Sequence, residues 1–154
     1  MFFCKTSTGH HTDEDTNSQK PDHNVRKSIE YWLKERNGIR MDSKKLVLGL
    51  ASYGRTWNLP DACNNWQIGT SVPSQGGIGG PLTNSAGFLA YYEICNKNWQ
   101  NHICTSSAGN TVNAPYGSDG KSFIGYDDEE SIQYKVRITV SLLHFLEPNS
   151  MDIT

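Results

Sequence analysis

The sequence has few of the residues that fill a protein core. Only 36% of its 154 residues are hydrophobic and its mean hydropathy is −0.59, whereas apolar residues usually approach half of a globular domain. No apolar run comes near the ~18 residues that a membrane-spanning helix needs, so we expect no membrane partner. A chain of this composition is either rich in loops or a part of a larger fold.

An excess of positive charge is missing as well. The formal net charge is −2 and the isoelectric point is near 6.2, so no basic stripe is available to neutralise phosphates, which argues against nucleic acid as a partner. The first residues, Met1 to Lys5, have neither the charged region nor the apolar stretch of a signal peptide. We therefore expect no signal peptide in this sequence.

Cysteine is scarce, and its spacing excludes several site types. The four cysteines are Cys4, Cys63, Cys95 and Cys104, too few for a disulfide-rich scaffold. No C-x-x-C pair occurs, which argues against a zinc knuckle or a thioredoxin-like site. An even number permits two disulfides in three connectivities, and free thiols fit equally well.

One cluster of metal-type residues occurs near the start of the chain. His10 and His11 lie beside Asp13 and Asp15, but they belong to a polar stretch without periodicity, which predicts a loop. Metal ligands need a rigid supporting shell of hydrogen bonds, so we predict a solvated loop, no metal site and no cofactor.

Hydrophobic spacing predicts a helix followed by a strand. Residues 25–36 predict a helix with Asn24 as its N-cap, because its apolar residues fall on one face: Val25, Ile29, Trp32 and Leu33. The near-continuous apolar run 45–53 predicts a strand that is covered on both faces, as in a parallel sheet. Together they predict an α/β fold.

The second half of the chain predicts two more helices around loops. The glycine-rich stretch 76–81 predicts a loop, and it lacks the following lysine of a phosphate-binding loop. A helix is predicted over 84–97, with Thr83 as N-cap, and a short strand over 123–126. The acidic run 127–130 predicts the start of a third helix, whose apolar face comprises Ile132, Val136, Val140 and Leu143.

Three stretches, in this order, resemble family 18 chitinases. They are KLVLGLASYGRTW at 45–57, GPLTNSAGFLAYYEICN at 80–96 and IGYDDEESIQYKV at 124–136. The resemblance covers about residues 8–136 and implies a TIM (β/α)8 barrel with an inserted α+β domain that forms one wall of a groove for chitin or N-acetylglucosamine oligomers.

The resemblance implies that this chain is an α/β fragment of that fold, an incomplete barrel carrying the insertion domain. We expect a polar start at 1–24, a barrel helix and strand at 25–56 and the insertion at 57–122. The chain then returns to the barrel at 123–147 and ends in a tail at 148–154. The family's last barrel strand is not found, so we expect a truncated product, extracellular by family resemblance.

Catalysis in this family is substrate-assisted, with a glutamic acid as proton donor, outside the usual two-carboxylate scheme. That acid belongs to an Asp-x-x-Asp-x-Asp-x-Glu motif. The acidic runs at 12–15 and 127–130 lack this spacing. The resemblance therefore assigns no catalytic residue here, and we expect the chain alone to be inactive. The alternative is a non-catalytic, lectin-like chitin-binding protein.

The resemblance also carries over candidate substrate-binding residues. Tyr53 and Arg55 follow the predicted barrel strand at the end where ligand groups belong, and Arg55 can donate several hydrogen bonds. The remaining candidates are Trp57, Ser85, Phe88 and Tyr116. Packing is the stronger expectation for Trp57 and Phe88, since most aromatic side chains belong to the core. Ser85 stands where the family commonly has glutamate, which weakens the expected affinity for chitin.

Overall fold

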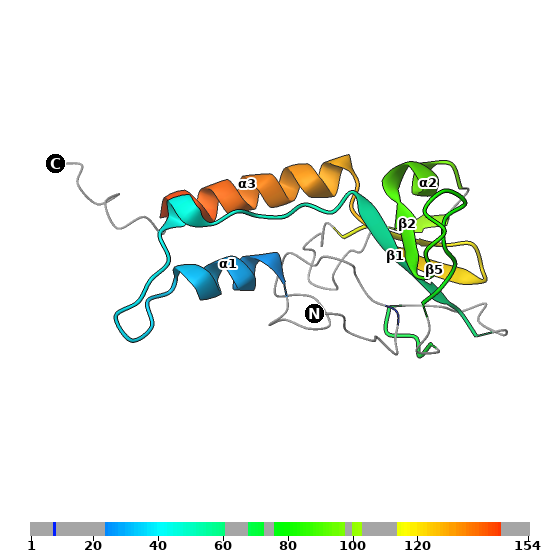
Figure 1. Ribbon diagram of the computed structural model, residues 1–154, viewed down its shortest axis with the longest axis horizontal. Helices are drawn as coiled ribbons and strands as arrows, with labels where there is room; N and C mark the ends of the chain where they lie inside the picture. The colour runs from blue at the N-terminus through cyan, green and yellow to red at the C-terminus, as the bar shows by residue number, and fades with distance from the viewer. Residues whose placement is uncertain are drawn as a thin grey trace.

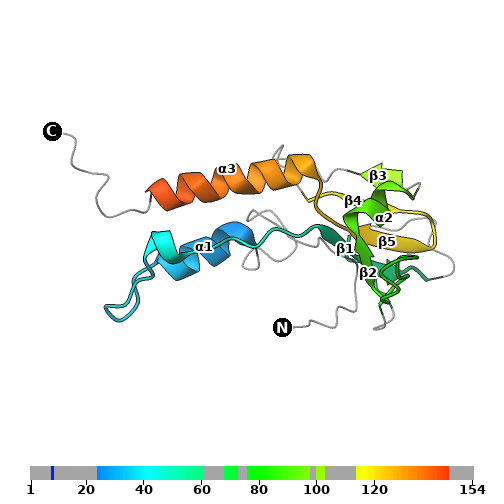
Figure 2. The ribbon, with the colours of Figure 1, turned by 45° about the horizontal axis from the view of Figure 1, so that its top comes forward.

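The chain has a helical part and a sheet part. The computed structural model describes residues 8, 24–60, 68–72, 76–97, 100–102 and 114–145. Helix α1 (Val25–Leu33) and helix α3 (Glu129–Phe145) lie side by side, and the sheet lies beyond one end of them (Figures 1 and 2). Residues 46–52 run alongside the helices before they enter the sheet (Figure 1).

The sheet has five antiparallel strands in the order β2-β1-β5-β4-β3. The strands are β1 (Tyr53–Asn58), β2 (Phe88–Ala90), β3 (Gln100–His102), β4 (Tyr116–Ser118) and β5 (Ser122–Gly125). The short helix α2 (Tyr91–Cys95) contacts β1 and β2. One core cluster, formed by Leu89, Ile94, Ile124 and Tyr126, lies between α2 and the sheet.

Helix α1 follows its sequence signals closely at its start. The side chain of Asn24 accepts a hydrogen bond from the Lys27 amide and caps the helix, as predicted. Ile29 and Leu33 are buried, but Trp32 is 53% exposed, so its predicted place on the core face is wrong. The helix ends at Leu33, earlier than expected.

The chain reverses in a tight turn after α1. Asn37 and Gly38 both have positive φ angles, 52° and 75°, as the central residues of a type I′ turn require. Arg36 and Ile39 exchange backbone hydrogen bonds of 2.9 Å in both directions. The single turn of 3₁₀ helix η1 (Ser43–Lys45) follows, with Asp42 capping it.

The strand predicted over 45–53 is shifted in the structure. Residues 46–52 are not part of any strand, and β1 instead spans Tyr53–Asn58, paired antiparallel with β2 and β5. Two apolar side chains of the predicted strand are not covered, since Val47 is 88% and Leu50 45% exposed, whereas Ala51 is buried. The described residues therefore form an α/β arrangement in which the expected barrel strand has no neighbouring strand.

The helix predicted over 84–97 is also wrong in most of its length. Only Tyr91–Cys95 is helical, with Ala90 at the N-cap position, while Phe88–Ala90 form β2. Gly87 has a φ of 77°, which a regular helix does not permit. Pairing with β1 therefore wins over helix propensity in this segment.

Helix α3 begins where it was predicted, but it buries a different face. Its buried residues are polar and recur every four positions: Ser131, Lys135 and Thr139. The apolar residues Val136 and Val140 are 42% and 48% exposed. Of the helices in the described part of the chain, none is long and apolar enough to cross a membrane.

Candidate functional site

Three of the predicted site residues meet on one face of the sheet. The rings of Tyr53 and Phe88 stack, with centroids 4.8 Å apart and planes at 28°. The guanidinium carbon of Arg55 lies 5.4 Å from the Tyr53 ring centre and 5.6 Å from that of Phe88, within the range of a cation–π contact. All three side chains are half-buried. We call Tyr53, Arg55 and Phe88 the aromatic–arginine cluster.

The strand register explains why these side chains share a face. Alternate residues of β1 point to the same side, and Phe88 pairs directly with Arg55. On the other side of β1, Arg55 pairs with Gly125, and Gly125 pairs in turn with Tyr116 on β4. Tyr116 therefore stands in the same cross-strand row as the cluster, separated from Arg55 by a residue without a side chain.

Trp57 continues this face but belongs to a core. It is 7% exposed and its ring is tilted against that of Phe123, at 5.7 Å between centroids. Phe123 also stacks on Tyr116 at 5.5 Å. Leu59 and Val72 complete the same buried cluster. The packing role expected for Trp57 agrees with this position, while its contact with sugar stays a prediction.

Ser85 is exposed and lies in the loop before β2. Its carbonyl accepts the amide of Phe88 at 3.1 Å, and its backbone leaves no room for a side chain on Gly79, where a Cβ would lie 2.7 Å from the Ser85 oxygen. Within the described residues, no hydrogen bond joins its hydroxyl to the aromatic–arginine cluster. Ser85 therefore shapes the loop that leads to Phe88.

The glycine-rich loop packs directly against β1. The amide of Gly77 donates to the Thr56 carbonyl at 2.9 Å, and the Thr56 hydroxyl donates to the carbonyl of Ile78 at 2.6 Å. A Cβ on Gly77 would lie 2.6 Å from the backbone of Trp57. Glycine is thus required for close backbone approach, and the predicted loop is confirmed.

Glu93 holds the loop that carries Ser85 in place, a role that the sequence analysis did not predict. Its buried carboxylate accepts four hydrogen bonds, from the amides of Leu82, Thr83 and Ala90 and from the Thr83 hydroxyl. Burial alone would raise the pKa of Glu93, but these hydrogen bonds outweigh it and lower the pKa to about 2. The only available signal was a glutamate at the third position of a helix, half of a capping box.

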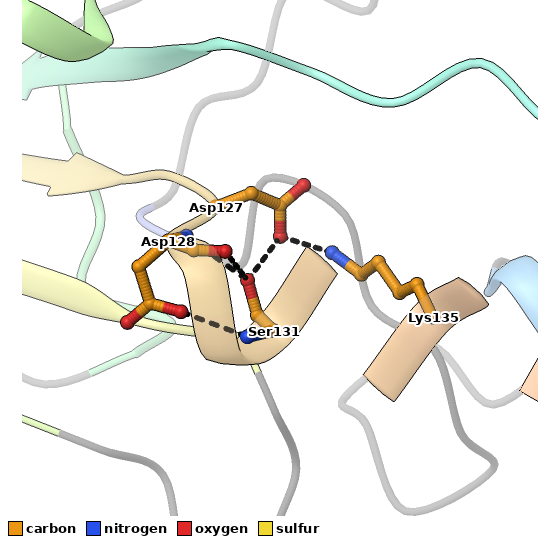
Figure 3. A network of polar contacts seen from close by, with 4 residues as sticks. All are labelled: Asp127, Asp128, Ser131 and Lys135. Carbon is orange, nitrogen blue, oxygen red and sulfur yellow. Dashed lines mark hydrogen bonds and ion pairs between the residues drawn. The ribbon is translucent and has the colours of Figure 1, made fainter. Parts of the chain in front are cut away.

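A second polar network joins β5 to α3 (Figure 3). The Asp127 carboxylate accepts from the Ser131 hydroxyl at 3.0 Å and from the Lys135 ammonium. Asp128 caps the helix, because its carboxylate accepts the Ser131 amide at 2.8 Å while its own amide donates back to the Ser131 hydroxyl. Asp127 and Asp128 thus have structural partners, as their position at the start of a helix predicted.

Two carboxylates in the described part of the sheet, Glu93 and Asp119, have lowered pKa values. A general acid needs a pKa raised toward the working pH, whereas that of Glu93 is lowered. Burial opposes ionisation of Asp119, yet its bond with Lys97 and two backbone amides lower its pKa as well. By contrast, burial raises the pKa of the Tyr126 hydroxyl to about 12, so this group stays protonated.

The described part of the chain bears on the predictions about metal ligands and cysteines. Among those residues, no three His, Cys, Asp or Glu side chains gather as metal ligands do. Cys95 is a free, exposed thiol. The other three cysteines and the predicted solvated loop at 10–15 lie outside the described residues.

Comparison with known proteins decides the family. The sequence model of "Glycosyl hydrolases family 18" matches residues 2–142. The chain belongs to glycosyl hydrolase family 18. Human "Chitinase-3-like protein 2" is 35% identical over 121 residues, 78% of this chain and 28% of that protein. The "Endochitinase" of Manduca sexta is 34% identical over 116 residues, 73% of this chain and 20% of that protein.

Solved family 18 structures share the arrangement described here. Human YKL-39, described as a pseudo-chitinase with retained chitooligosaccharide binding properties, matches with a TM-score of 0.71 and 30% identity over 88% of this chain. The match covers 36% of that structure. This chain therefore spans about a third of the length of YKL-39 in that structure, and a smaller share of the human and Manduca sexta relatives.

Proposed function

We propose that this family 18 chain binds chitooligosaccharides through its aromatic–arginine cluster and does not hydrolyse them by itself. The carrying observation is the stacked Tyr53–Phe88 pair with the Arg55 guanidinium beside both rings. A sugar ring presents a face of C–H bonds to an aromatic ring, and its acetamido and hydroxyl oxygens accept from a guanidinium. One half-buried cluster thus offers both kinds of contact.

The relatives support a ligand of this class. YKL-39, at 30% identity, retains chitooligosaccharide binding as a pseudo-chitinase, which is the combination proposed here. Tyr116 extends the binding row across Gly125, and Trp57 and Ser85 support it from the core and the loop. An extracellular place of action follows from the family and is part of the proposal.

The proposed lack of hydrolysis is supported by the carboxylates of the described residues. Glu93 and Asp119, two acids of the sheet part, both have pKa values lowered by their hydrogen bonds. Asp127 is paired with Lys135. Substrate-assisted cleavage still needs a carboxylic acid held against the bridging oxygen, and these groups are committed to other partners.

Calorimetric titration with chitopentaose tests the binding. We expect saturable binding that cellopentaose, which lacks the acetamido groups, does not reproduce. Arg55→Ala should weaken it about tenfold, or about 1.4 kcal/mol, whereas Arg137→Ala, at an exposed site on α3, should leave it unchanged. Equal affinity for cellopentaose, or no heat at all, contradicts the proposal.

A fluorogenic chitotrioside tests the second part of the proposal, that the chain does not hydrolyse chitooligosaccharides by itself. We expect no release of fluorophore by the purified chain over the buffer background. Turnover that is lost in a variant of this chain would show that an acid within it has been overlooked.

One observation favours a second function, in which this chain forms part of a chitinase whose other barrel strands come from another polypeptide. Residues 47–51 make no backbone hydrogen bond with any other described residue, and the side chains of Val47 and Leu50 are 88% and 45% exposed. Such a segment accepts neighbouring strands. Mixing the chain with a family 18 chitinase from which the matching segment is deleted tests this, and restored chitotrioside hydrolysis would favour it.

A further inference from the structure

A short junction connects the sheet to the helical pair at the start of α3. Helix α3 contacts α1, while α2 contacts β1 and β2. Residues 126–128 lead directly from β5 into α3. The amide of Tyr126 donates to the Pro115 carbonyl at 3.1 Å, which fixes the sheet side of this junction. The Asp127 network holds the helix side.

The central feature of the junction is a buried ion pair. Asp127 and Lys135 have side chains that are only 1% and 2% exposed. The carboxylate oxygen that receives the Lys135 ammonium also receives the Ser131 hydroxyl (Figure 3). Since Ser131 and Lys135 lie one helical turn apart, the carboxylate spans the first two turns of α3.

Stability alone does not explain such a pair. Taking two charges out of water is costly, and apolar residues of similar volume often replace a buried pair without loss of stability. The ion pair and the hydroxyl that it shares are held by hydrogen bonds, which require a specific geometry. Hydrophobic contact has no such directional requirement. The pair therefore specifies one arrangement of α3 against the strand exit.

This arrangement bears on the sugar-binding face. Asp127 lies two residues beyond Gly125, which stands between Arg55 and Tyr116 in the cross-strand row. Residues 46–52 run beside the helices and enter the sheet at Tyr53. The helical pair is thus connected to the sugar-binding row from both sides, through β5 and through β1.

We propose that Asp127 and Lys135 are positioning residues, which fix the orientation of α1 and α3 relative to the sheet face that carries the aromatic–arginine cluster. For its effect on binding, this inference rests on the proposed chitooligosaccharide function. Its effect on orientation does not depend on any ligand.

The deciding variant is the double substitution Asp127→Asn/Lys135→Met, which nearly keeps the side-chain volumes and removes both charges. Donor and acceptor dyes are placed through p-azidophenylalanine at Asn58 and Arg137, both exposed and on opposite sides of the junction. Energy transfer then reports the distance between sheet and helix. Lys121→Met, an exposed charge removal, is the matched control, and Lys135→Met alone shows the cost of one unpaired charge.

We expect the double variant to unfold cooperatively at a denaturant concentration near that of the wild type, with a broadened or shifted distance distribution and about tenfold weaker chitopentaose binding. The control should match the wild type in every measurement. An unchanged distance distribution overturns the proposal, and so does loss of cooperative unfolding, which would make the pair a stability element. A shifted distance with unchanged affinity overturns the positioning role in binding.

The two proposals can fail separately. If the wild-type chain binds no chitopentaose, the proposed function is wrong, and the energy-transfer comparison alone decides whether the pair sets the orientation.

Discussion

The ring of Phe88 on β2 stacks on the ring of Tyr53 on β1, although the two residues are not directly paired. Tyr53 pairs with Ala90, and Phe88 pairs with Arg55, so the stacked rings are diagonal neighbours, within reach of each other on an antiparallel pair. Arg55 then lies close to both rings, at 5.4 and 5.6 Å. The three side chains therefore act as a unit.

Removing the Phe88 ring should weaken sugar binding. In Phe88→Ala, Tyr53 loses its stacking partner and Arg55 loses one of two aromatic contacts. We expect chitopentaose affinity to fall about tenfold, corresponding to about 1.4 kcal/mol, as measured by calorimetry. Tyr92→Ala removes an exposed ring from α2 and should have no effect. Equal losses in both variants would point to general destabilisation.

The low pKa of Glu93 predicts acid sensitivity. The folded-state pKa is about 2 and the ordinary value 4.5, so this group stabilises the fold above the ordinary value and stops doing so as the pH falls toward 2. Urea unfolding midpoints should drop across this window in the wild type. Glu93→Gln should be less stable at neutral pH and should lose less stability than the wild type across this window, with Asp119 contributing to the loss that remains. A wild-type profile that Glu93→Gln reproduces contradicts the assignment.

Gly80 should not tolerate a side chain. A Cβ at this position would lie 2.1 Å from the carboxylate atoms of Glu93, so Gly80→Ala must displace the anchor of the loop. We expect a loss of about 1–3 kcal/mol, typical of overpacking, measured by urea unfolding. Gly49→Ala is the control, since a Cβ there meets nothing within 4 Å. A smaller effect at Gly80 than at Gly49 would contradict the geometry.

The open segment before β1 should promote self-association. Val47 is 88% exposed on a stretch that has no backbone partner among the described residues, and such edges template pairing with other chains. Val47→Lys should reduce concentration-dependent association in sedimentation velocity without changing stability. Leu82→Lys changes a residue that is 75% exposed away from this segment. If both substitutions act equally, added charge rather than edge protection is the cause.

Local signals in the sequence predicted the starts of α1 and α3, but not those of α2 and β1. Asn24 and the acidic run before α3 identified two helix starts, because capping depends on residues within one turn. The glycine loop and β5 were also found. The register of β1 was not, because its partners β2 and β5 lie some thirty or more residues further along the chain, and no local pattern encodes such pairing.

The face of α3 was misjudged for a different reason. Ser131, Lys135 and Thr139 keep the same helical spacing as the apolar stripe, so periodicity fits both faces and hydropathy favoured the wrong one. The candidate site came from family resemblance rather than from spacing. Phe88 was expected on a helix, and only its place on β2 accounts for its stacking on Tyr53.

The way in which Glu93 holds its loop restricts how the gene can diverge. A lineage that gains a side chain at Gly80 must displace the carboxylate, and four donors then need a new acceptor at the same moment. A lineage that first loses the carboxylate leaves the same donors without a partner. Neither single step is neutral, so we expect positions 80 and 93 to covary among homologues or to stay fixed together.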